Sequence, residues 1–170
     1  MDHWFSVIAA GSELSADSVK EMDDVGFVVI PGPVAPPQLS RLAAAYDAAV
    51  ERVFDTLEWL ERRLSRQRFL LGDNLTEADI RLFTTLIRFD AVYFGHFKCN
   101  RRPIVGYPSL WSYTRELYRH PDIQPTVNFQ HIKGHYYGSH QWINPSGIIP
   151  TGPDLEFDAP SNRTSVHGEQ

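Results

Sequence analysis

The sequence predicts an all-α protein, a helical bundle with a short irregular or β-stranded segment before it and an extended arm after it. Two observations support this prediction. Apolar residues recur three and four positions apart through most of residues 42–138, which is the spacing of amphipathic helices. Prolines concentrate outside that range, where they interrupt regular structure.

The composition narrows the class of protein. A chain of 170 residues that is 42% hydrophobic and 12% aromatic can bury one core of ordinary size. Its net charge of −5 provides no basic surface for nucleic acid, and its single cysteine cannot form an internal disulfide. No apolar run approaches the roughly 18 residues of a membrane span. We therefore predict a cytoplasmic globular domain that binds neither nucleic acid nor membrane.

The first element is an N-terminal segment, residues 1–42, which is too short for a complete domain. The β-branched run from Val25 to Ile30 predicts one short strand. Four prolines follow within residues 31–37, and they predict an extended connection.

The helical domain is predicted over residues 43–157 and starts with an amphipathic helix that ends at Leu64. A Gly-Asp-Asn turn follows, and Thr76 can then cap a second helix while Asp79 reaches back to the Thr76 amide, as in a capping box. The second helix is predicted to be long, because an apolar stripe continues over five positions. These are Leu82, Leu86, Phe89, Tyr93 and Phe97.

Two more helices and an arm complete the predicted domain. Pro108 suits the first turn of a third helix, which His120 and the following proline end. A fourth helix is predicted from Thr126 to Tyr137, closed by Gly138. The rest is rich in proline and glycine, which predicts an extended arm and then a flexible tail over residues 158–170.

Four consecutive motifs carry a resemblance to a known family. They are "FLLGDNLTEADIRLFTTLIRFDAVYFGHFKCN", "YPSLWSYTRELY", "TVNFQHIKGHYYGSH" and "INPSGIIPTGP". Over residues 43–157 the chain resembles the C-terminal helical domain of glutathionyl-hydroquinone reductases, the Xi class of glutathione S-transferases. Residues 1–50, with "DDVGFVVIPGPVAPPQLS", instead resemble the N-terminal segment of phytanoyl-CoA dioxygenase family proteins. Together the two resemblances imply a join between two fragments.

The resemblance implies a glutathione-dependent chemistry. Xi-class enzymes reduce glutathionyl-hydroquinones through a cysteine thiolate that attacks the glutathionyl sulfur, and a second glutathione then releases the enzyme. The family carries this cysteine in a thioredoxin-like domain upstream of the matched region, where this sequence has no Cys-Pro motif. The resemblance thus implies a quinol-binding domain without its nucleophile. Glutathione is the family's co-substrate, and a homodimer is the expected assembly.

Two tyrosines are the candidate site residues. The resemblance maps two family tyrosines, which lower the pKa of the catalytic cysteine, onto Tyr93 and Tyr136. A phenol does this by donating a hydrogen bond to the thiolate. The alternative is that both are core tyrosines with satisfied hydroxyls, because aromatic stripes commonly belong to a core.

Cys99 is an alternative nucleophile. Lys98, Arg101 and Arg102 lie beside it in the sequence and could favour its thiolate form. We favour a structural role, since free cysteines are commonly small core residues. The same basic cluster could bind a carboxylate of glutathione, although a solvated helix end explains it equally simply.

Histidines suggest two metal sites, and neither is favoured. His131, His135 and His140 have a spacing compatible with zinc, but no His-Glu-x-x-His motif accompanies them. His120 and Asp122 match part of the ligand set of non-haem iron dioxygenases, which hold such ligands on barrel strands. We therefore predict no metal.

The leading hypothesis is a substrate-binding domain of a glutathionyl-hydroquinone reductase-like protein, inactive alone. One alternative is an enzyme completed by Cys99 or by a thioredoxin-like partner. Another is a structural or dimerisation module that binds no small ligand. An iron and 2-oxoglutarate dioxygenase fragment is the most distant alternative.

Overall fold

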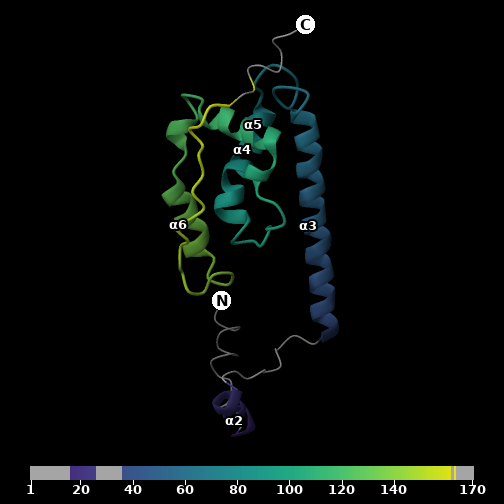
Figure 1. Cartoon of the computed structure of the whole chain (residues 1–170), viewed down its shortest axis with the longest axis vertical. Coiled ribbons are helices and arrows are strands. Elements are labelled where there is room, and N and C mark those ends of the chain that lie inside the picture. Colours follow the sequence, from purple (N-terminus) through teal and green to yellow (C-terminus); the bar gives the residue numbers. More distant parts are fainter. Residues whose placement is uncertain (1–15, 26–35, 162, 164–170) are drawn as a thin grey trace. The chain divides into compact units, whose positions relative to one another are not determined.

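The computed structural model describes residues 16–25, 36–161 and 163, and it forms helices joined by turns (Figure 1). The main helices are α2 (Ala16–Val25), α3 (Pro36–Leu64), α4 (Glu77–Arg88), α5 (Pro108–Tyr118) and α6 (Phe129–Ser139). Three short turns are η1 (Phe89–Tyr93), η2 (Ile104–Gly106) and η3 (Gln124–Thr126). Within the described ranges there is no strand, so the all-α prediction is confirmed. None of the described helices is long and apolar enough to cross a membrane.

The chain divides into two units, Met1–Tyr46 and Asp47–Gln170. In the first unit, α2 ends at Val25, where the sequence predicted the start of a strand; the remainder of that predicted strand, residues 26–30, lies outside the described residues. Two of the four prolines of the expected extended connection, Pro36 and Pro37, lie instead in the first turn of α3. Proline is tolerated in the first turn of a helix, where its missing N–H would have no partner.

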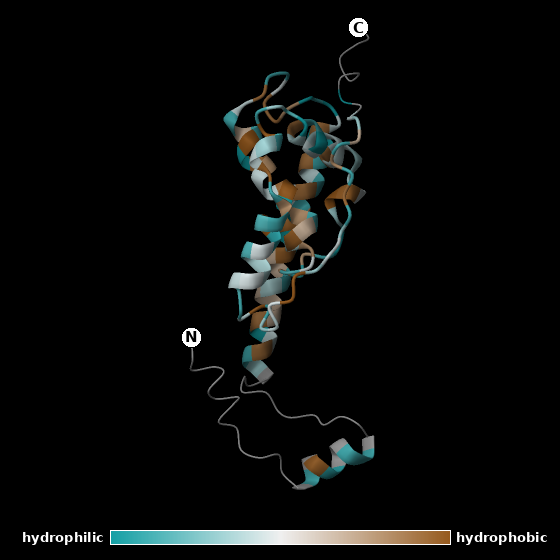
Figure 2. Cartoon of the chain, turned by 90° about the vertical axis from the view of Figure 1, so that its left-hand side faces the viewer, coloured by the Kyte–Doolittle hydropathy of each residue, from teal (hydrophilic) through white to brown (hydrophobic). Residues whose placement is uncertain are grey.

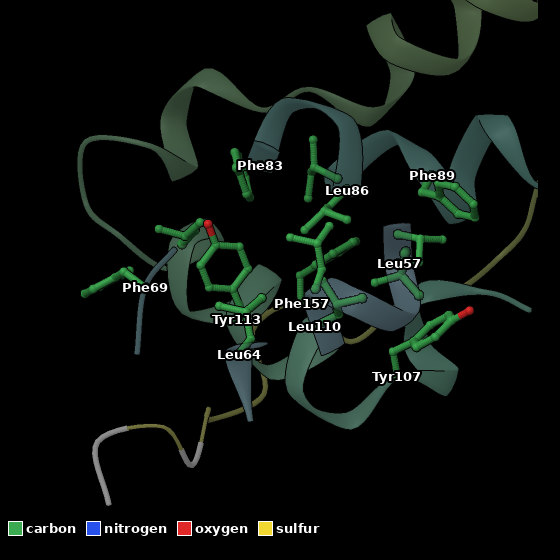
Figure 3. Close-up of a cluster of buried hydrophobic side chains, with 14 of the residues drawn as sticks. Leu57, Leu64, Phe69, Phe83, Leu86, Phe89, Tyr107, Leu110, Tyr113 and Phe157 are labelled. Atoms are coloured by element: carbon green, nitrogen blue, oxygen red, sulfur yellow. The ribbon is translucent and has the colours of Figure 1, made fainter. Parts of the chain in front are cut away.

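The core lies in the second unit, where α4 and α5 pack against each other and apolar side chains of α3 join them (Figure 3). In Figure 2 the hydrophobic residues gather between the packed helices, and the hydrophilic ones lie mostly on their outer faces. Phe157, from the C-terminal arm, belongs to the same cluster. The predicted stripe of α3 is buried in its C-terminal part, whereas its members Tyr46 and Val53 are exposed; four of its side chains belong to the core. They are Phe54, Leu57, Leu60 and Leu64.

Asp79 connects three segments of this unit. Its fully buried carboxylate accepts hydrogen bonds from Leu70 N at 2.8 Å, Thr76 N at 2.9 Å and the Tyr113 hydroxyl at 2.9 Å. The predicted capping box of Thr76 and Asp79 is therefore present. Burial opposes ionisation of Asp79, but the hydrogen bonds outweigh it and lower the pKa of the carboxyl group. In Figure 3 the Tyr113 hydroxyl points to the α4 side of the cluster. There it donates its hydrogen bond to the Asp79 carboxylate.

The second predicted helix is shorter than expected. It ends at Arg88, and a π-helical turn replaces its continuation, with Phe94 N donating to Phe89 O at 2.8 Å. Asp90 in this turn is buried and accepts from two backbone amides, Ile104 N at 2.6 Å and Val105 N at 3.1 Å. Burial raises the pKa of Asp90, although both hydrogen bonds act in the opposite direction.

The last two helices match the prediction in part. Helix α5 begins at Pro108 as predicted. Helix α6 begins later than the predicted Thr126, because that residue ends a 3-10 turn, and the Asn128 side chain caps α6 by accepting from His131 N at 2.9 Å. It continues to Ser139, so Gly138 lies inside the helix and does not close it.

Arg163, which lies in the predicted tail, is buried in the second unit. Its guanidinium forms an ion pair with Glu116 at 3.4 Å. It also donates to the backbone carbonyls of Leu64, Gln67, Arg68 and Ser109. Arg163 is therefore bound to α5 and to the C-terminal end of α3 with the turn after it.

Substituting Asp79 with asparagine should lower the free energy of unfolding by about 3 kcal/mol at pH 7, because a buried, charge-assisted hydrogen-bond network loses its anion. Since the folded pKa of Asp79 is lowered, its stabilisation is present above the unfolded pKa and is lost as the pH falls through the folded value. Urea unfolding at pH 7 and at pH 3 measures both effects. Glu77→Gln, at an exposed position of the same turn, is the control. Equal losses in the two variants would contradict this role of Asp79.

Candidate functional site

A cleft of about 650 Å³ opens between α4, α6 and the segment that connects α5 to α6. Its six apolar side chains are Ile80, Phe83, Ile87, Ile123, Val127 and Ile132. Its polar side chains are Thr84, Arg88, Asp122, Thr126, Asn128, His131, His135 and Tyr136. The cleft is therefore of mixed character, with an apolar surface from α4 and α6 and polar groups beside it that could orient a small molecule.

The two tyrosines singled out in the sequence meet beside this cleft. The ring centroids of Tyr93 and Tyr136 are 5.9 Å apart, with the rings nearly perpendicular at 76°. Phe97 lies 5.4 Å from Tyr93 and 5.8 Å from Tyr136. Both tyrosines are half-buried, and Tyr136 also lines the cleft. The π-helical turn brings Tyr93 to this position, because Tyr93 is its last residue.

Tyr93 is a neutral hydrogen-bond donor over the physiological pH range. Burial raises the pKa of its phenol to about 12, and a side-chain hydrogen bond with Tyr136 contributes to the same effect. The positive charge of Arg88 acts in the opposite direction and lowers this pKa. A phenol held in this way can stabilise an anion that forms beside it, such as a thiolate or a phenolate.

Two histidines that the sequence did not indicate as a pair complete the cluster. His96, 2% exposed, has its Nε2 3.0 Å from Nδ1 of His140, and their rings stack at 5.2 Å. Burial, then the nearby His140 and Lys98, lower the pKa of His96. We call Tyr93, His96, Phe97, Tyr136 and His140 the aromatic wall. Within each segment the members are three or four residues apart, but only tertiary packing brings Tyr93, His96 and Phe97 against Tyr136 and His140.

Cys99 lacks the surroundings of a reactive thiol. Burial raises its pKa, and its Sγ lies 3.9 Å from the Phe97 carbonyl oxygen. The neighbouring cations have other partners. Lys98 Nζ donates to the Gly95 carbonyl at 2.9 Å, Arg101 pairs with Glu51 at 2.5 Å, and Arg102 pairs with Glu58 at 3.0 Å. The structure therefore gives Cys99 a packing role. The two arginines of the basic cluster form ion pairs with glutamates of α3.

The histidines considered as metal ligands do not converge. His131 and His135 are exposed at the cleft, whereas His140 faces His96. His120 Nδ1 lies 3.8 Å from the Asp122 carboxylate and accepts from the Asp122 amide at 3.3 Å, which is a local turn contact. Among the residues described, no group of three His, Cys, Asp or Glu side chains could hold a metal ion.

Comparison with known proteins identifies the domain. Residues 43–116 match the family model of the glutathione S-transferase C-terminal domain. The chain carries a glutathione S-transferase C-terminal domain. The chain is 56% identical over 109 residues to the glutathionyl-hydroquinone reductase PcpF of Sphingobium chlorophenolicum, covering 64% of this chain and 35% of that protein. It is 52% identical over 119 residues to the glutathionyl-hydroquinone reductase YqjG of Escherichia coli, covering 70% and 36%.

Solved structures agree with this assignment. The glutathione-bound structure of YqjG from Escherichia coli aligns with a TM-score of 0.71 at 50% identity, over 72% of this chain and 40% of that one. An Xi-class transferase from Natrialba magadii aligns with a TM-score of 0.70 at 48% identity, over 73% and 39%. The transferase fold predicted from the sequence is thus confirmed. The chain spans little more than a third of the length of the two reductases, so their full activity is not established for it.

Alkaline titration tests the pairing of Tyr93 with Tyr136. In ultraviolet titration at 295 nm, the difference between the chain and its Tyr93→Phe variant should appear near pH 12, which is the range of the Tyr93 phenol. Tyr136→Phe should move that step to lower pH, because the hydrogen bond that raises the Tyr93 pKa is lost. Arg88→Gln should move it to higher pH. A Tyr93 step near pH 10 in the unaltered chain would contradict the pairing.

Proposed function

We propose that this transferase domain supplies the quinol-binding wall of a glutathionyl-hydroquinone reductase-type site. The contact of Tyr93 with Tyr136 beside the α4–α6 cleft is the observation that carries the proposal. The apolar residues of the cleft can receive an aromatic ring, and the paired phenols can donate to an oxygen or sulfur anion next to it. Similarity to two proteins named as glutathionyl-hydroquinone reductases supports the same ligand class.

In this proposal the thiol chemistry belongs to a thioredoxin-like domain, in the same or another polypeptide. Its cysteine thiolate attacks the glutathionyl sulfur of the substrate, and a disulfide with glutathione forms. The carbon–sulfur bond breaks, its electron pair stays on the ring carbon, and that carbon takes up a proton. A second glutathione then reduces the mixed disulfide. Tyr93 and Tyr136 would stabilise that thiolate by hydrogen bonding. The half-buried Cys99, whose pKa burial raises, is not suited to replace the nucleophile.

Two further assignments follow from the same resemblance. Glutathione would be the co-substrate, and most of the residues that bind it would belong to the thioredoxin-like domain. The domain would assemble as a homodimer through helical surfaces. Its location in the cytoplasm remains a prediction from composition.

A specific feature supports a second candidate, an association module without a small ligand. An apolar groove of about 330 Å³ runs between α3 and α4 in the second unit. Val53 in this groove is 37% exposed, although Leu57 and Leu60 beside it are buried. Apolar surface of this kind commonly marks a contact with another protein segment.

Isothermal titration calorimetry of the purified chain with a glutathionyl-hydroquinone, in oxygen-free buffer, tests the proposal. We expect measurable heat of binding, and Tyr136→Phe should weaken the affinity about fivefold through the loss of one hydrogen bond. Tyr118→Phe, which alters a tyrosine outside the cleft and the wall, should bind like the unaltered chain. No heat from a folded, helical sample would overturn the proposal and favour the association module.

A further inference from the structure

Arg88 is a cation of the cleft that no sequence motif indicated. It is the last residue of α4, it is half-buried, and its side chain lines the cleft together with Tyr136. Its Nη1 donates to the Thr84 carbonyl oxygen at 2.5 Å, a bond that folds the guanidinium back along the helix. Within the described part of the chain, no carboxylate lies within ion-pair distance of Arg88.

The arginine earlier on the same helix differs in this respect. Arg81 is paired with Glu77 at 2.6 Å, and both side chains are 78% exposed. Arg88 thus keeps most of its five N–H donors available for another acceptor, next to an apolar surface that includes Phe83 and Ile87. A charge-assisted hydrogen bond in such partly desolvated surroundings is stronger than one in open water.

Few acids of the cleft compete for Arg88. Among the lining residues that the structure describes, Asp122 is the one carboxylate, and its side chain is 90% exposed. Arg88 and Tyr136, a member of the aromatic wall, line the same cleft. A ligand with an acidic group at Arg88 can therefore also contact the aromatic wall.

We propose that Arg88 binds a carboxylate of the ligand whose aromatic ring lies against the aromatic wall. The cleft then selects aromatic compounds that carry an acidic substituent over neutral quinols of the same size. This inference rests on the proposed function, and it names the substrate class of that site. In a glutathionyl-hydroquinone, the carboxylates of the glutathionyl group supply the acid.

Calorimetry with two matched ligands tests this assignment. One is a glutathionyl-hydroquinone, and the other is its dimethyl ester, in which both carboxylates are masked. For the unaltered chain, the ester should bind about tenfold more weakly. Arg88→Gln should weaken binding of the acid by about tenfold and leave binding of the ester unchanged. Arg88→Lys, which keeps the charge but not the planar fork, should fall between them.

Arg81→Gln is the control for a general effect of charge on the same helix, and it should behave like the unaltered chain. The inference is overturned if the ester and the acid bind Arg88→Gln with the same tenfold difference, or if Arg81→Gln reproduces the Arg88→Gln result. Binding of the ester that depends on Tyr136 would in that case leave the proposed function standing. Binding of the acid that depends on Arg88 but not on Tyr136 would instead reject the proposed wall and keep the arginine site. Absence of binding by either ligand would reject both.

Discussion

The packing of the second unit depends most on the hydrogen bonds that the anionic carboxylate of Asp79 accepts. Three segments donate to it: the turn after α3 through Leu70, the start of α4 through Thr76, and α5 through Tyr113. A fully buried acid is expensive unless every acceptor position is used, and here hydrogen bonding is strong enough to keep it ionised. The direction of α4 is thereby fixed relative to α5, and α4 in turn supplies one side of the cleft.

A second buried acid, Asp90, holds the backbone that follows the C-terminal end of α4. Asp90 accepts the amides of Ile104 and Val105, so the turn after Arg88 is held against the segment before α5. In that turn the backbone widens to a π helix, which often occurs at functional sites. The wider turn changes the direction of the residues that follow α4, and Tyr93 comes to face Tyr136 of α6. The site therefore results from a local break in helical geometry.

The sequence was sufficient for the regular parts of the molecule. The capping box at Thr76, the proline start of α5 and the buried stripe of α3 follow from local rules, and each is present. The π turn was missed, because Phe89 and Tyr93 fit the stripe of an ordinary helix and the partners of Asp90 lie 14 and 15 residues away. His96 with His140, and Arg88 in the cleft, were missed for the same reason: only tertiary packing brings these residues to their partners. The two candidate tyrosines were singled out from the sequence, while their contact comes from tertiary packing and their role stays a proposal.

Fluorine nuclear magnetic resonance of the chain labelled with 3-fluorotyrosine tests most directly whether the aromatic wall meets a ligand. Each of the seven tyrosine signals can be assigned with its Tyr→Phe variant. On titration with a glutathionyl-hydroquinone, the signals of Tyr93 and Tyr136 should shift in proportion to saturation, while that of the fully buried Tyr113 should stay in place. Unchanged signals from Tyr93 and Tyr136 at saturating ligand would contradict the account.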